Sequence, residues 1–149
     1  MVPAFRTVLV GRPRSRFQWA LDAFVALLVL IGTFGAYALD VFQVSGGVVV
    51  LPGAATLVGF AVAVGVGARR SGLLVAWVSL FAAYLGFQAE WAFLGLSSHS
   101  LVGKLAFLFD PVGLVVLDVA SLVIGTIGFT TGSIGRLSID RLRGRTVSQ

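Results

Sequence analysis

Asp118 is the residue whose type and position are best suited to chemistry. It follows Pro111 by seven positions in an apolar stretch, so a helix beginning at that proline places it about 10 Å below the helix end. In hydrocarbon an ionised carboxylate is disfavoured by up to about 3 kcal/mol, and the group must be protonated, paired or hydrated. Asp118 is therefore expected either to bind a proton or cation, or to donate a hydrogen bond that fixes helix register.

Further polar side chains are expected at a similar depth on neighbouring helices. By the same counting Gln88 lies about 9 Å below the same surface, so the two residues match in depth and could form a hydrogen bond. The other polar residues in the outer half of the apolar segments are Thr33, Tyr37, Thr56, Tyr84 and Ser121. Together these residues predict a polar cluster that opens outward, where a small ligand or ion could bind.

Residues for enzyme and cofactor chemistry are scarce. The chain has no Cys, one His (His99) and one Met (Met1), which excludes a thiol pair, a Cys-ligated metal and a pair of axial haem ligands. The single Lys, Lys104, falls in a loop, and the sequence has no Gly-rich phosphate-binding loop. We therefore expect a protein without enzymatic activity, cofactor or metal.

The composition indicates that lipid surrounds most of the chain. Hydrophobic residues make up 58% of the sequence and charged residues only 11%, with a mean hydropathy of +1.01. Soluble domains carry roughly 25% charged residues, so the composition predicts an integral membrane protein. Arg far outnumbers Lys and Asn is absent, which favours a prokaryotic plasma membrane.

The positions of the charges divide the chain into four uncharged runs. The runs extend over residues 23–39, 41–68, 71–89 and 119–135, and each is long enough to form the body of a helix that crosses a bilayer, which needs roughly 20 residues. We expect a single integral membrane domain over residues 1–149, an antiparallel bundle of four transmembrane helices at residues 17–42, 47–68, 72–94 and 111–135. A cleavable signal ending at Ala36-Tyr37-Ala38 is the alternative for the first helix, whose apolar run is longer than a signal core.

The basic residues predict the orientation of this bundle. Ten of the eleven lie on one side, in residues 1–16, between the second and third helices, and in residues 136–149. Because Lys and Arg near helix ends are retained in the cytoplasm, both termini are predicted to be cytoplasmic. The net charge of +5 then reflects topology, and anionic lipid headgroups rather than nucleic acid are the expected partners.

The connection between the third and fourth helices is the longest one. Within it Leu101, Leu105 and Leu108 recur at helical spacing, which predicts a short helix lying in the outer membrane interface. A break is expected at Asp110-Pro111, because Asp caps helices and Pro is favoured in a first helical turn.

Small residues form stripes on two of the predicted helices. On the fourth helix Asp118 and Ser121 are continued by Gly125, Gly128, Gly132 and Gly135, at alternating spacings of three and four. The second helix carries a matching ridge of Ala55, Gly59, Ala63 and Gly67. Since close backbone contact is a main source of helix association in lipid, these faces are predicted to pack on each other or on a partner.

Two functions follow from these patterns. The first is a small non-enzymatic membrane protein that acts as a subunit or accessory assembly factor of a membrane complex, or associates with itself, through its small-residue faces. The alternative is a small proton- or cation-coupled carrier or channel, working as a homo-oligomer. Asp118 would then be the coupling acid, surrounded by Gln88, Tyr84 and Thr56.

Overall fold

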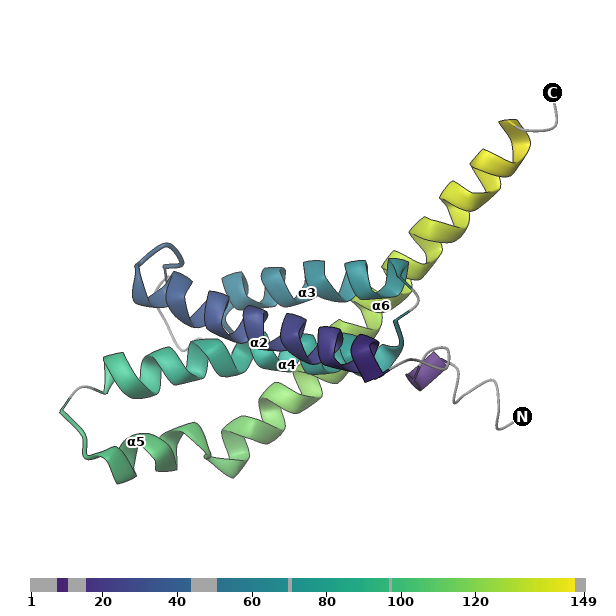
Figure 1. Cartoon of the computed structure of the whole chain (residues 1–149). Coiled ribbons are helices and arrows are strands. Elements are labelled where there is room, and N and C mark those ends of the chain that lie inside the picture. The colour runs from purple at the N-terminus through teal and green to yellow at the C-terminus, as the bar shows by residue number, and fades with distance from the viewer. Residues whose placement is uncertain (1–7, 11–15, 44–50, 70, 97, 147–149) are drawn as a thin grey trace.

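The computed structural model describes residues 8–10, 16–43, 51–69, 71–96 and 98–146, and within these ranges it contains helices and no strand. After one helical turn at residues 8–10 come five longer α-helices and a π-helical turn (Figure 1). Their bounds are α2 (Arg16–Ala38), α3 (Gly53–Ala68), α4 (Leu73–Glu90), η1 (Trp91–Gly95), α5 (Leu101–Leu108) and α6 (Pro111–Thr146). The prediction of an all-helical chain is confirmed for these residues.

Three helical segments are long and apolar enough to cross a membrane. They are Arg16–Ala38, Leu73–Gly95, which joins α4 to η1, and Leu101–Arg141, which contains α5 and most of α6. The remaining apolar helix, α3, has 16 residues and a length of about 24 Å, which is shorter than the roughly 30 Å hydrocarbon core. The chain therefore has the helices of a multi-pass membrane protein.

Helix α4 lies at the centre of the bundle. It packs against α2, α3 and α6, and α3 also packs along α6, whereas α2 and α3 contact each other little. In Figure 1, α2 and α3 run alongside α4, and α6 crosses them obliquely before projecting beyond the bundle. Half of the residues in the apolar stretch of α4 are buried, against 11% for α2, so α4 supplies more of the core than any other helix.

Two helix ends differ from the predicted ones for local reasons. Helix α2 ends at Ala38 rather than at residue 42, because the chain turns at Asp40, whose φ of 55° is in the left-handed region that Asp tolerates. Helix α3 begins at Gly53 rather than at residue 47, because Pro52 is extended and forms its N-cap. Residues 47–50 of the predicted second helix lie outside the described residues.

The break before the last helix is found where it was predicted. Helix α5 ends at Leu108, and Asp110 Oδ2 accepts a hydrogen bond of 2.7 Å from the Gly113 N–H in the first turn of α6. Helix α5 is tied back to η1, since Lys104 Nζ donates to the Phe93 carbonyl at 3.1 Å. The connection is therefore ordered by short-range hydrogen bonds.

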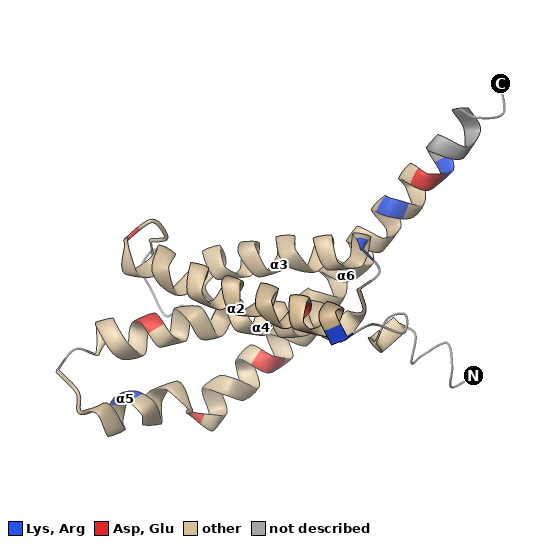
Figure 2. Ribbon diagram, viewed as in Figure 1, with Lys and Arg blue, Asp and Glu red and all other residues tan. Residues whose placement is uncertain are grey.

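Helix α6 continues past Gly135, where the sequence predicted its end, as far as Thr146. No proline follows Gly135, and Arg136 and Asp140, one turn apart, approach to 3.7 Å. Arg136 Nη1 also donates to the Ala68 carbonyl at the C-terminal end of α3, at 3.0 Å, where a cation interacts favourably with the helix dipole. Figure 2 shows basic residues at this end of the bundle and along the projecting part of α6.

Candidate functional site

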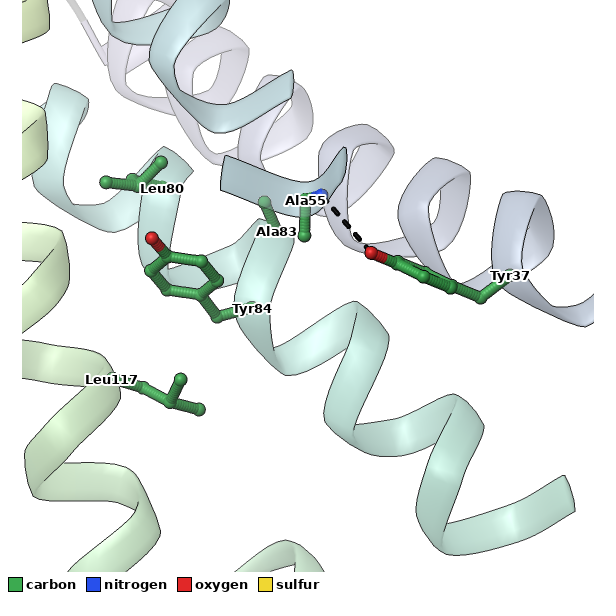
Figure 3. Close-up of a cluster of buried hydrophobic side chains, with 6 residues drawn as sticks. All are labelled: Tyr37, Ala55, Leu80, Ala83, Tyr84 and Leu117. Atoms are coloured by element: carbon green, nitrogen blue, oxygen red, sulfur yellow. Dashed lines mark hydrogen bonds between the residues drawn. The ribbon is translucent and has the colours of Figure 1, made fainter. Parts of the chain in front are cut away.

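Four helices meet in a buried cluster where α2 ends and α3 begins (Figure 3). Its members are Tyr37 from α2, Ala55 from α3, Leu80, Ala83 and Tyr84 from α4, and Leu117 from α6. Two of the predicted polar residues, the tyrosines, are thus brought to one core. Both are almost fully buried, so their hydroxyls need partners inside the protein.

The Tyr84 hydroxyl lies 3.0 Å from Thr56 Oγ1 on α3. Thr56 Oγ1 also donates to the Pro52 carbonyl at 2.9 Å, and because a hydroxyl has one proton, Tyr84 must be the donor to Thr56. The chain of hydrogen bonds therefore runs from Tyr84 through Thr56 to a backbone carbonyl and ends there. It joins α4 to the first turn of α3.

Tyr37 satisfies a backbone group of α3. Its hydroxyl accepts a hydrogen bond of 3.3 Å from the N–H of Ala55, one of the first N–H groups of the helix, which have no partner within it. The Tyr37 ring meets Phe87 and Phe42 edge to face, with centroids at 4.8 and 5.3 Å. Tyr37 therefore caps α3 from α2.

The other predicted members of the polar cluster are dispersed. Ser121 is buried and donates to the carbonyl of Leu117 in its own helix, at 2.7 Å. Gln88 Nε2 donates to the Phe107 carbonyl at the end of α5, at 3.3 Å. Thr33 is buried, and its Oγ1 has no hydrogen-bond partner among the described residues. Of the predicted polar cluster, Tyr37, Tyr84 and Thr56 are therefore brought together, whereas the other members form no hydrogen bond with them among the described residues.

Asp118 lies apart from all of these groups. It is exposed on α6 and forms no hydrogen bond or ion pair with any described residue. Ser121, about 60° away around the helix, faces the core instead. The stripe that begins with Asp118 therefore points inward from Ser121 to Gly132 and leaves the acid on its exposed flank.

Packing contacts give the depth of Asp118 relative to α4. A Cβ added at Gly125 would lie 2.9 Å from Trp77 Cδ1, so these residues are level. Helices α4 and α6 run in opposite directions. Two turns from Gly125 toward the start of α6 is Asp118, and two turns from Trp77 toward the end of α4 is Tyr84, so Asp118 and Tyr84 lie at the same depth. Gln88 is level with Gly113 instead, at 3.5 Å from the corresponding Cβ position, so the predicted hydrogen bond between Gln88 and Asp118 is not formed.

The two small-residue stripes pack on each other within the chain. A Cβ at Gly128 would lie 2.9 Å from Ala63 Cβ, and one at Gly132 would collide with the Val64 carbonyl oxygen. A Cβ at Gly67 would likewise collide with the Phe129 carbonyl oxygen of α6, whereas Gly59 packs on Leu80 of α4. Ala55 belongs to the central cluster, and Gly135 has open space around it. The predicted packing faces are therefore largely occupied inside the bundle.

Two interhelical contacts were missed by the sequence analysis. Trp77 Nε1 on α4 donates to Thr126 Oγ1 on α6 at 3.0 Å. A Cβ at Gly86 would lie 2.5 Å from the Leu30 carbonyl oxygen, so α2 and α4 touch there through their backbones. The indole N–H of Trp77 and the missing side chain of Gly86, each inside an apolar helix, indicated a close contact with another helix. The residues that they contact depend on how the helices pair, which the sequence does not give.

An apolar groove of about 300 Å³ separates α2 from α3. It is lined by Val25, Leu28, Val29, Gly32, Thr33, Phe42 and Val58, and it has almost no polar surface to orient a ligand. The described residues contain no group of three or more potential metal-ligating side chains. Among the predicted site residues, Asp118 is the one whose ionisable side chain is exposed.

Comparison with known proteins supplies no relative. No family model, curated protein or solved structure matches the chain.

Removal of the Tyr84 hydroxyl tests the hydrogen bond between α4 and α3. Tyr84→Phe should lower the free energy of unfolding by about 0.6 to 1 kcal/mol, the usual size of an interhelical hydrogen bond in membrane proteins. Unfolding of the purified protein by SDS in mixed micelles measures this loss. In a Thr56→Val background the same substitution should have little further effect, and an equal loss in both backgrounds would contradict the assignment.

Proposed function

We propose that this protein is a non-enzymatic subunit or accessory factor that binds laterally to another membrane protein. The observation that carries the proposal is the exposed carboxyl of Asp118, level with the middle of α4 and without a partner among the described residues. An acid in the apolar part of a transmembrane helix raises the free energy of insertion, by up to about 2.5 to 3.5 kcal/mol at the helix centre. Association that covers the acid recovers part of this free energy.

The proposal includes the orientation predicted from the charges. Arg16 begins α2, Arg69 ends α3, and Arg136 binds the C-terminal carbonyl of α3, so these basic residues share one end of the bundle. Basic residues at helix ends favour the cytoplasmic side. In this arrangement α3 is a fourth, short crossing, α5 lies at the outer interface, and the projecting end of α6 is cytoplasmic, in a plasma membrane of a prokaryote.

The surface proposed for association differs from the small-residue faces. Those faces are used within the bundle, where Gly128 and Gly132 meet α3. The flank of α6 that carries Asp118 is instead bordered by the exposed side chains of Val115 and Leu122, about one turn to either side. A partner helix is proposed to bind along this Asp118 flank, formed by Val115, Asp118 and Leu122.

The second candidate is a proton- or cation-coupled carrier built as a homo-oligomer. Its support is the same carboxyl, which copies of the chain could bring together at a shared interface. Within one copy the hydrogen bonds of Tyr84 and Thr56 end at the Pro52 carbonyl and do not reach Asp118. A carrier would therefore need its pathway between copies, which makes this candidate the weaker of the two.

Native mass analysis after purification in a mild detergent tests the proposal. A foreign membrane protein should copurify in fixed stoichiometry with the wild-type chain and be lost with Asp118→Leu. Assemblies made only of this chain would overturn the subunit function. The carrier is tested in reconstituted vesicles, where it requires a pH-dependent flux that disappears in Asp118→Asn.

A further inference from the structure

Within the proposed function, we infer that the partner surface is a transmembrane helix that places an Arg or Lys side chain opposite Asp118. The inference rests on that function because it names the chemistry of the same contact. A carboxylate in hydrocarbon is stabilised most by a cationic donor, which neutralises the charge and satisfies the oxygens at once. A purely apolar helix provides neither a positive charge nor a hydrogen-bond donor for the carboxylate.

This chain cannot supply that cation from its own membrane segments. Arg69 and Arg136 lie at the inner end of the bundle, and Lys104 is on α5, where its Nζ donates to the Phe93 carbonyl. No Lys or Arg occurs in the sequence between residues 105 and 135 or between residues 71 and 103. A second copy would bring only another acid to this depth, so the basic group must come from a different protein.

The charges at the outer end of the bundle favour the same partner. Asp40 follows α2, Glu90 ends α4, and Asp110 precedes α6, so three acids face one Lys on this side of the described structure. These acids outnumber the single Lys, so this half of the described structure carries a local excess of negative charge. A basic helix is attracted to this half and an acidic one is repelled.

The direct test uses synthetic transmembrane peptides and the full-length protein in zwitterionic vesicles. One peptide is an apolar helix with tryptophan anchors and a single Arg about 10 Å from one end; its matched control has Leu at that position. Energy transfer between labels on protein and peptide measures association. The Arg peptide should bind about tenfold more tightly than the Leu peptide, a difference of about 1.4 kcal/mol.

Three variants of Asp118 and one control variant separate ionic pairing from other effects. Asp118→Leu and Asp118→Asn should reduce binding of the Arg peptide to the level of the Leu peptide, whereas Asp118→Lys should bind a peptide with Glu in place of Arg. Val119→Leu alters an exposed neighbour about 100° around the helix and should change nothing. Equal binding of both peptides by the wild type, or binding of the Arg peptide by Asp118→Leu, would overturn the inference.

Photocrosslinking from position 115 in native membranes separates the inference from the proposed function. A crosslinked foreign helix with Arg or Lys near the linkage supports both. A foreign helix without a basic residue there overturns the inference and leaves the subunit function standing. If no foreign helix is crosslinked to this flank, the subunit function fails and the inference fails with it.

Discussion

Gly132→Ala should destabilise the folded bundle by about 2 kcal/mol, because one added methyl group has no room between α6 and α3. A Cβ at this position collides with the Val64 carbonyl oxygen and lies 3.0 Å from the Ala68 nitrogen, and both of these atoms belong to the backbone of α3. Backbone atoms cannot rotate away as a side chain can, so the two helices must separate. Unfolding by SDS in mixed micelles measures the free-energy change.

Gly135→Ala is the matched control for this substitution. It lies on the same helix, one turn away, and nothing lies within 4 Å of its Cβ position. The added methyl should leave the stability unchanged or raise it slightly, since Ala favours helix more than Gly does. If both variants lost the same stability, the cause would be helix propensity and not the contact between α3 and α6. Gly132→Ile should enlarge the difference between the two positions.

Gly86→Ala should have a comparable effect on the contact between α2 and α4. Its Cβ position lies 2.5 Å from the Leu30 carbonyl oxygen and 3.1 Å from the Phe34 nitrogen. Because α2 is held to the bundle mainly by α4, a loss of about 1 to 3 kcal/mol is expected, together with movement of α2 away from α4. Spin labels on α2 and α4 measure the increase in distance, and detergent unfolding measures the loss of stability.

The controls for Gly86 lie on the facing helix. Gly32 and Gly35 of α2 have nothing within 4 Å of their Cβ positions, so alanine at either one should leave the distance between α2 and α4 as it is. A similar displacement of α2 in these variants would show that the labels report helix fraying. An unchanged distance in Gly86→Ala would contradict the close backbone contact.

Much of the helical framework could be predicted from local patterns. The uncharged runs indicated α2, α4 and α6, and Asp110 before Pro111 indicated the break at which α6 begins. These features depend on residues close together in sequence, through the hydrophobicity of a segment and the capping of its first turn. The predicted ends at residues 42 and 135 differed from the structure, because a left-handed Asp40 stops α2 and no strong helix breaker stops α6.

The candidate site was less predictable, because it depends on how each helix is rotated about its axis. Sequence spacing placed Asp118 and Ser121 on one stripe, and the stripe does face α3 and α4 from Ser121 to Gly132. A stripe has two edges, however, and spacing alone does not decide which edge is buried. The predicted match in depth between Gln88 and Asp118 was wrong for a related reason. Which residues of two neighbouring helices lie at the same depth depends on how the helices pack, and packing places Gln88 beside Gly113.

By itself the sequence determined that the chain is helical and apolar, with basic residues gathered toward one side, since each of these properties adds up residue by residue. The tertiary structure alone decided that the small-residue stripes pack on each other inside the bundle and that the Tyr84 hydroxyl donates to Thr56. It also left Asp118 facing outward. The reason is steric: helices settle where their backbones approach most closely, and the side chains at the edges of those contacts are exposed as a consequence.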